Sequence, residues 1–248
     1  MNYRIAIPSY KRSKVVKDKS INYLINDCNI NPKLIDVFVA NKKEYKDYKY
    51  LESFGINIIV GVITLKEQRK YINNYYNDGD FIIQIDDDIN YLTKKKGKST
   101  EKFIEIDKLI KIGFNECLKH RTKIFGITPT NNHFFMNNKI STNLKFINGG
   151  FFGIIIDKDK NLDINVNEKE DYERTIKYFI KFKKVIRLNM FSLNTTYYKG
   201  DGGMVDSRTT KEQNNSALYL CKKYPNLISI NPHRKSKYLE LRLNSRAI

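Results

Sequence analysis

The sequence predicts an α/β protein with a mostly parallel central sheet flanked by helices. Apolar segments of strand length alternate with longer segments in which apolar residues recur every three or four positions. The strand-length segments are almost wholly apolar, which is typical of parallel strands covered on both faces. The chain has 248 residues, of which 41% are hydrophobic. That length and content allow one large domain or two small ones, and because the sequence shows no repeat and no long linker we expect a single domain over residues 1–248.

The alternation is clearest before residue 129. Five segments predict strands: residues 3–10, 34–40, 56–62, 81–88 and 123–128. Four segments predict helices: residues 14–26, 44–54, 65–76 and 102–118. Pro8 stops the first strand, and Gly55 closes the second helix. Because open sheets of this kind bind ligands beyond the carboxyl ends of their strands, we expect a ligand site at that edge.

The pattern becomes less regular after residue 140. The segment KFINGGFFGIIID, residues 145–157, predicts a strand, a turn and a second strand. Residues 169–182 predict a helix, and residues 183–193 predict a strand. The lysine-rich KKKGKS, residues 94–99, is the best candidate for a mobile loop.

Three consecutive carboxylates, Asp86, Asp87 and Asp88, end the apolar segment FIIQI. Adjacent strand residues point to opposite faces, so Asp86 and Asp88 share one side and Asp87 faces elsewhere. Two carboxylates aimed at one spot repel unless a cation lies between them. Mg²⁺ and Mn²⁺ prefer such oxygen ligands and often bridge them to substrate phosphates. The cluster therefore predicts a divalent-metal site, with a solvated acidic turn as the alternative.

Two further motifs carry candidate residues. Gly149 and Gly150 in INGGFFG indicate a tight turn or a close approach of the backbone to a ligand, with a plain hairpin as the alternative. Glu170 and Asp171 open a predicted helix, whose dipole alone would favour acids there. Either one also suits a general base, which needs a carboxylate within reach of an acceptor hydroxyl.

The charge of the chain is strongly positive. There are 45 Lys+Arg against 27 Asp+Glu, a formal net charge of +18. Such a surplus predicts an anionic partner such as nucleic acid or nucleotide phosphates. Late in the chain, His233 is a possible metal ligand and Arg234 a possible phosphate contact, with a solvated basic tail as the alternative.

The order of these motifs resembles the GT-A fold of nucleotide-sugar glycosyltransferases. IPSYKR, residues 7–12, looks like the first-strand signature of that fold, and KEQRKY, residues 66–71, lies where such enzymes often carry a basic residue. The resemblance covers residues 3–235. It implies a nucleotide-sugar-binding half at residues 1–128 and an acceptor-facing half at residues 129–248.

The resemblance also implies a role for each candidate. Asp88 and His233 would hold a divalent metal, Mn²⁺ or Mg²⁺, and Asp86 would assist near the ribose or sugar of a UDP-sugar. Asp87 could replace either neighbour, because three aspartates leave the register ambiguous. Asp171, or Glu170 beside it, would be the general base of an inverting transfer. The remaining residues implied to contact the donor are Ser9, Tyr10, Arg12, Arg69, Gly149, Gly150 and Arg234.

Within that fold, IPSYKR, QIDDDI and INGGFFG look closest to the base J type DNA glucosyltransferases, which are associated with TET/JBP oxygenases and occur in phages and large viruses. The resemblance implies transfer of a sugar, with glucose favoured, to the hydroxymethyl group of a modified pyrimidine in DNA, with hydroxymethyluracil favoured. A DNA acceptor requires phosphate neutralisation, which the basic surplus offers. Aromatic residues in segments 131–138 and 195–206 are candidates for stacking, although most aromatic residues are expected in the core.

Other functions remain open at this point. The acceptor could be a glycan, a lipid or a protein, or the chain could be a non-enzymatic nucleic-acid-binding module. A metal-dependent nuclease or nucleotidyltransferase is disfavoured, because Asp36 lies at the opposite end of its strand. The sequence has no run of about 18 apolar residues and no signal segment, and its three cysteines lack zinc-site spacing. We therefore expect an intracellular protein with reduced thiols and no membrane span.

Overall fold

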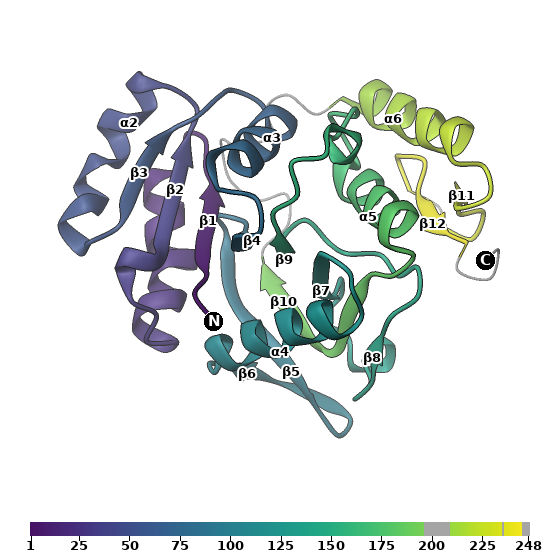
Figure 1. Ribbon diagram of the computed structural model, residues 1–248, viewed down its shortest axis with the longest axis horizontal. Helices are drawn as coiled ribbons and strands as arrows, with labels where there is room; N and C mark the ends of the chain where they lie inside the picture. The colour runs from purple at the N-terminus through teal and green to yellow at the C-terminus, as the bar shows by residue number, and fades with distance from the viewer. Residues whose placement is uncertain (196–208, 235, 245–248) are drawn as a thin grey trace.

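One large mixed sheet organises the molecule, with helices packed on both faces (Figure 1). The computed structural model describes residues 1–195, 209–234 and 236–244. The strands follow the order β3-β2-β1-β4-β9-β7-β10-β5-β6 across the sheet, and β8 pairs with β10. A separate two-stranded sheet consists of β11 and β12.

The first four strands are parallel neighbours and alternate with helices. They are β1 (Arg4–Pro8), β2 (Ile35–Val39), β3 (Asn57–Val60) and β4 (Phe81–Ile85). The helices between them are α1 (Ser13–Val16), which continues in wider turns to Asp27, α2 (Lys42–Tyr48) and α3 (Leu65–Tyr75). A 3-10 turn (Lys49–Phe54) follows α2 and ends at Gly55, whose φ of 84° is left-handed. This half agrees with the predicted alternation, with ends displaced by a few residues.

The second half of the sheet includes antiparallel strands. β9 (Phe151–Ile155) runs antiparallel to both β4 and β7 (Ile124–Thr128), and β10 (Ile186–Thr195) runs parallel to β7. From β3 to β10 every strand therefore has one direction except β9, which confirms the mostly parallel sheet. The remaining elements are β5 (Ile89–Lys96), β6 (Ser99–Phe103), β8 (Ile140–Ser141), β11 (Ile228–Ile230), β12 (Leu241–Leu243), α4 (Ile106–Lys119), α5 (Glu170–Phe182) and α6 (Thr210–Lys223).

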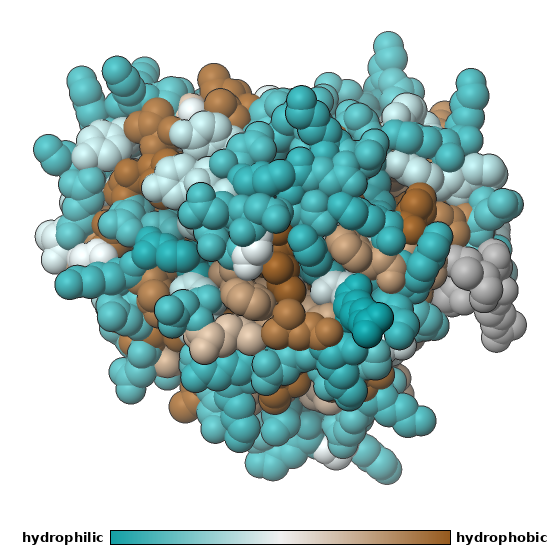
Figure 2. Space-filling model, viewed as in Figure 1, coloured by the Kyte–Doolittle hydropathy of each residue, from teal (hydrophilic) through white to brown (hydrophobic). Residues whose placement is uncertain are grey.

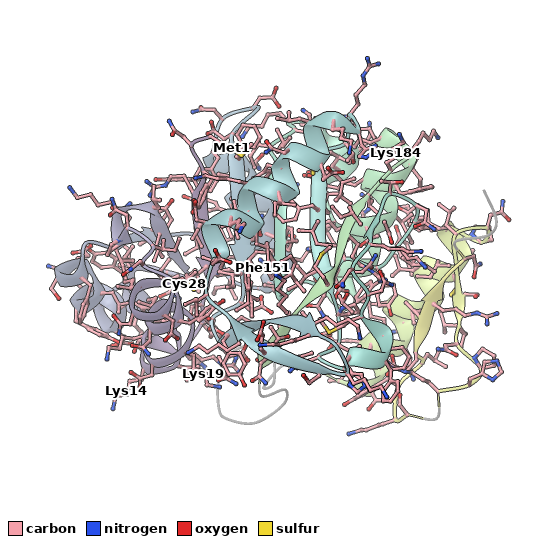
Figure 3. The ribbon with its side chains drawn as sticks, turned by 90° about the horizontal axis from the view of Figure 1, so that it is seen from below. Met1, Lys14, Lys19, Cys28, Phe151 and Lys184 are labelled. Carbon is pink, nitrogen blue, oxygen red and sulfur yellow. The ribbon has the colours of Figure 1, made fainter. Side chains whose placement is uncertain are left out.

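The core has one apolar cluster on each face of the sheet. Ile5 and Ile7 of β1 pack in the cluster that includes α4, whereas Ala6 between them packs in the cluster that includes α3 and α5. Phe151 and Phe152 of β9 divide in the same way. This alternation follows from the two-residue period of a strand. Figure 3 shows Phe151 inside the molecule, while Lys14 and Lys19 lie at its outer edge.

Three predictions about individual segments are wrong. KKKGKS is not a mobile loop: it forms the end of the β5–β6 hairpin, with Gly97 in a left-handed turn at φ 57°. Residues 145–148 form no strand, so INGGFFG is a turn that leads into β9 alone. The fourth predicted strand ends at Ile85, before the aspartates. Charged side chains on an edge ribbon hide the hairpin from a reading by hydrophobic pattern.

The register brings distant segments to one edge of the sheet. Ile85, the last residue of β4, pairs with Phe151, the first residue of β9. The N–H of Asp86 then donates to the carbonyl of Gly150 at 3.0 Å. Pro8 ends β1 next to β4, so residues 9–12 emerge at the same edge. The three aspartates, the Gly-Gly turn and the loop after β1 thus meet beyond the carboxyl ends of β1 and β4, as expected for a ligand site.

Candidate active site

The three consecutive aspartates have three different surroundings. Asp86 is held by Arg69, with 2.8 Å between Oδ1 and Nη2, and 39% of its side chain is exposed. Asp87 is buried. Asp88 accepts from Thr195 Oγ1 at 3.1 Å and lies 3.4 Å from Arg12 Nη1, with a partly exposed side chain. Asp86 and Asp88 therefore present carboxylate surface to the open edge, while Asp87 faces the interior.

Asp87 anchors the loop that follows β1. Ser9 Oγ donates to Asp87 Oδ2 at 2.6 Å and shares a 2.8 Å hydrogen bond with the hydroxyl of Tyr48. That hydroxyl accepts from the backbone N–H of Arg12 at 2.8 Å. The Arg12 guanidinium in turn lies 3.4 Å from Asp87 Oδ1. One buried carboxylate and one tyrosine thus fix the loop that the family resemblance implies would meet the nucleotide.

From its position on α3, Arg69 connects β4 to the turn before β9. It is only 3% exposed. Its Nη1 donates to Gln84 Oε1 at 2.9 Å, and its Nη2 donates both to Asp86 Oδ1 at 2.8 Å and to the Gly149 carbonyl at 2.9 Å. A planar guanidinium suits such divergent acceptors better than an ammonium does. The side chain therefore sets the orientation of Asp86 relative to the Gly-Gly turn.

Gly149 and Gly150 lie where a side chain would collide with the site. The Asn148 side chain accepts from the Gly150 N–H at 2.6 Å and closes the turn. A Cβ on Gly149 would come within 3.0 Å of Glu170 Oε1, and a Cβ on Gly150 would come within 2.9 Å of Leu193 and 3.5 Å of Asp86 Oδ2. Both glycines therefore let neighbouring side chains pack closely against the backbone, and they form the tight turn that was one of the two sequence expectations.

The first turn of α5 brings Glu170 and Asp171 to this turn. Glu170 is buried and pairs with Arg174 at 2.5 Å, one helical turn later. Arg174 is itself buried, and its guanidinium lies 3.7 Å from the centre of the Phe152 ring. Asp171 is partly exposed and accepts from the backbone N–H of Tyr172 at 3.0 Å. Of the two acids, Asp171 is the one without a side-chain cation bonded to it in the described structure.

Three aspartates of the site have raised pKa values, mainly because of desolvation. Desolvation raises the pKa of Asp86 to about 6, Arg69 opposes this, and the negative charges of Asp88 and Glu170 add to it. Desolvation raises the pKa of Asp87 to about 7 against the hydrogen bond from Ser9. Desolvation and the adjacent Glu170 raise the pKa of Asp171 to about 6, while Arg174 lowers it. Because repulsion between neighbouring carboxylates adds to desolvation, a cation placed between them would favour their charged forms.

Asp86 and Asp88 suit a divalent ion whose remaining ligands come from substrate phosphates and water. Within the described ranges, no three His, Cys, Asp or Glu side chains gather closely enough to hold an ion. Asp86 and Asp88 do influence each other electrostatically and both reach solvent. Mg²⁺ and Mn²⁺ are commonly held by one or two carboxylates together with substrate phosphates and water. The donor set therefore fits an ion that arrives with a diphosphate.

The structure does not bring every sequence candidate to this edge. His233 and Arg234 are exposed in the connection between β11 and β12, and the His233 N–H donates to Asn231 Oδ1. In Figure 1 that hairpin lies on the far side of α5 from β4. Tyr10 lies in the loop after β1, where the Lys11 ammonium is 5.1 Å from the centre of its ring. Of the aromatic segment 195–206, residues 196–206 lie outside the described residues.

Three residues of the site escaped the sequence interpretation. Arg174 had one available signal, its spacing of four from Glu170 on a predicted helix. Tyr48 and Thr195 act on Ser9 and Asp88 from 39 and 107 positions away along the chain. Contacts of such separation leave no local pattern, so only the fold reveals them.

Comparison with known proteins identifies the fold. No protein-family model matches the chain, and no curated protein matches it. The crystal structure of S. aureus TarS 1–349 in complex with UDP-GlcNAc superposes with a TM-score of 0.56 at 13% identity, covering 89% of this chain and 67% of that one. This chain spans 40% of a longer TarS chain.

A second solved structure agrees. The mannosyltransferase PcManGT from Pyrobaculum calidifontis, in complex with GDP-Man and Mn²⁺, superposes with a TM-score of 0.54 at 9% identity, covering 90% of this chain and 64% of that one. Such identities establish the fold alone. The expected GT-A-like architecture is therefore confirmed. Separately, none of the described helices is both long enough and apolar enough to cross a bilayer.

Proposed function

We propose that this chain is a glycosyltransferase that uses a nucleotide-diphosphate sugar and a divalent metal. One observation carries the proposal. Arg69 bonds both Asp86 and the Gly149 carbonyl, so it joins Asp86 to the Gly-Gly turn. Asp171 lies on the other side of that turn. This arrangement lies at the ligand-binding edge of a fold shared with TarS, solved with UDP-GlcNAc, and PcManGT, solved with GDP-Man and Mn²⁺. We favour UDP as the nucleotide and Mn²⁺ or Mg²⁺ as the ion.

Each residue has a chemical role in this proposal. Asp88 and Asp86 would hold the ion, which when bound neutralises the charge that develops on the diphosphate leaving group. Ser9, Tyr10 and Arg12 would line the nucleotide pocket, because their loop is fixed beside the aspartates. His233 and Arg234 have no described contact with this edge, so we assign them no part in the reaction.

Asp171 would act as the general base. It would take the proton of the acceptor hydroxyl while the acceptor oxygen bonds to the anomeric carbon of the sugar. The bond between that carbon and the diphosphate oxygen breaks, and the nucleoside diphosphate leaves with the electron pair. Attack opposite to the leaving group inverts the anomeric configuration. Glu170 is less suited to this role because its Oε2 forms an ion pair with Arg174 Nη1 at 2.5 Å.

The acceptor we favour is a hydroxymethylated pyrimidine in DNA, with hydroxymethyluracil first and glucose as the sugar. The motifs that resemble the base J type enzymes support this choice, and so does the net charge of +18. A glycan, lipid or protein acceptor is the alternative. The base would need to leave the helical stack to reach Asp171, since an enzyme cannot act on it inside the duplex.

One experiment tests both levels of the proposal. The protein is incubated with Mn²⁺, one of several UDP-sugars and an oligonucleotide containing hydroxymethyluracil or hydroxymethylcytosine, and the digested nucleosides are weighed by mass spectrometry. We expect a gain of one hexose with UDP-glucose, abolished by Asp171→Asn. Release of UDP without any gain in nucleoside mass would refute the DNA acceptor and leave sugar transfer standing. If no nucleotide sugar gave either UDP release or sugar transfer, the proposal that this chain is a glycosyltransferase would be refuted.

A further inference from the structure

Two phenylalanines stand out from the surface near the β5–β6 hairpin. Phe134 is 82% exposed and Phe135 is 66% exposed, the highest values for large hydrophobic side chains in the described structure. They lie in a short turn (His133–Phe135) between β7 and β8. Exposing two adjacent aromatic rings to water is unfavourable, so a pair of this kind indicates a binding surface.

The turn is fixed in place. Lys95 Nζ donates to the His133 carbonyl at 2.7 Å, and Thr93 Oγ1 donates to Asn131 Oδ1 at 2.9 Å. Asn132 Oδ1 accepts from the Phe134 N–H at 3.1 Å. The rings therefore project from a turn that is tied to β5 on one side and stabilised by its own side-chain cap on the other.

Lysines lie on the segments next to this turn, and Lys95 contacts it directly. Alternation along β5 puts Lys95 on the face that carries Thr93 and meets the turn, while Lys94 and its cross-strand neighbour Glu101 lie on the opposite face. Lys98 at the hairpin end and Lys139 after the turn are exposed. Among the described residues no carboxylate pairs with Lys95, Lys98 or Lys139. We call Lys95, Lys98, Lys139, Phe134 and Phe135 the lysine–phenylalanine surface.

The surface is remote from the aspartates and is joined to them along the chain by β5. β5 begins at Ile89, directly after Asp88, and Lys95 lies six residues further along. At about 3.3 Å per residue this separation is roughly 20 Å. In Figure 1 the hairpin extends away from the body of the sheet. A ligand that contacts both places is therefore an extended polymer rather than a monosaccharide or a nucleotide.

We infer that the lysine–phenylalanine surface binds unpaired bases of the DNA strand that carries the acceptor. This inference rests on the proposed function and adds to it the place and form of the DNA. Aromatic rings stack on exposed bases of any sequence, and lysines beside them neutralise the phosphates. Asn131, Asn132 and Asn138 are exposed near the rings, and the amide nitrogens of Asn131 and Asn132, whose oxygens hold the turn, can donate to base edges. The view in Figure 2 is mostly hydrophilic, as expected for a protein with so many lysines.

Binding to a labelled single-stranded 20-mer of thymidine, followed by fluorescence anisotropy, tests the inference. We expect Phe134→Ala with Phe135→Ala to weaken binding at least tenfold, since each stacked base contributes substantially. The matched control is Phe54→Ala, which removes a half-exposed ring from the turn after α2. Lys98→Gln with Lys139→Gln should weaken binding and flatten its salt dependence, whereas Lys222→Gln on α6 should do neither.

The outcomes separate the surface from the reaction. The inference would be overturned if the variant with both Phe134→Ala and Phe135→Ala bound the 20-mer as tightly as the wild type. It would also be overturned if the wild type bound vesicles of anionic phospholipid but did not bind the 20-mer. UDP release from UDP-glucose with Mn²⁺ is measured in the same preparations, and we expect the phenylalanine variants to retain it. A third outcome separates the two proposals. If the phenylalanine variants lost 20-mer binding while even the wild type transferred no sugar, the surface would be supported and the proposed reaction refuted.

Discussion

Arg69 Nη2 lies 2.8 Å from Asp86 Oδ1, and the same nitrogen lies 2.9 Å from the carbonyl of Gly149. One buried guanidinium thus joins the end of β4 to the turn before β9. The ion pair has one partner almost fully buried and one partner that reaches solvent. This asymmetry keeps the Asp86 carboxylate in a fixed direction at the open edge, which suits a ligand-binding acid.

Replacing Arg69 by alanine should therefore abolish activity and reduce stability. Breaking a fully buried ion pair removes about 3–5 kcal/mol. Because Asp86 remains accessible to water, we expect about 2 kcal/mol here. Urea unfolding measures the change in free energy. Arg69→Lys keeps the charge but lacks the fork that reaches Gln84 and Asp86 together, so it should retain more stability than alanine and little activity. Equal activity of the lysine variant and the wild type would contradict this role.

The pH dependence of transfer should report Asp171 and its two charged neighbours. A base is active as the carboxylate, and the pKa of Asp171 is raised to about 6 by burial and by Glu170. Activity should therefore fall as the pH drops through about 6. Glu170→Gln removes a negative charge, so the acid limb of kcat/KM should move to lower pH, by about one unit. A limb that stays in place would exclude Asp171 as the titrating base.

Arg174 should shift the same limb in the opposite direction. Its positive charge lowers the pKa of Asp171 and binds Glu170. Arg174→Gln should therefore move the limb to higher pH and reduce stability, because Glu170 stays buried without its cation. The conservative Arg174→Lys should keep part of the wild-type stability and move the limb less than Arg174→Gln does. A purely structural residue would change stability without moving the limb, so the direction of the shift separates the two roles.

Asp88 and Asp87 should respond differently to the same small change. Asp88→Asn keeps the hydrogen bond with Thr195 but removes the exposed charge, so binding of Mn²⁺ in the presence of UDP should fall at least tenfold in calorimetry with little change in melting temperature. Asp87→Asn should mainly lower the melting temperature, since the buried carboxylate holds Ser9 and Arg12. The reverse pattern would assign the ion to Asp87.

Much of this site was predictable because its residues sit at the ends of regular elements. The aspartates, the Gly-Gly turn and the acids that open α5 each interrupt an apolar or helical pattern, and the parallel strand order brings them to one edge. The hairpin after Asp88 was not predictable, since lysines on both faces of an edge ribbon erase the two-residue hydrophobic period. The aromatic segment 131–138 was a candidate for stacking, but its pattern could not show that Phe134 and Phe135 would be exposed, because aromatic residues usually lie in a core.

Tyr48 gives the most specific test of the loop that follows β1. Its hydroxyl joins the Ser9 hydroxyl and the Arg12 N–H, each at 2.8 Å, and burial raises its pKa to about 12, so it stays protonated. Tyr48→Phe leaves the Arg12 N–H without this acceptor, and we expect a loss of about 1–2 kcal/mol in urea unfolding together with weaker UDP binding. Tyr45→Phe is the matched control, because among the described residues the Tyr45 hydroxyl on the same helix bonds only the exposed Glu52. Unchanged UDP affinity in Tyr48→Phe would show that the loop keeps its shape without this hydroxyl, and equal losses in both variants would trace the effect to α2 itself.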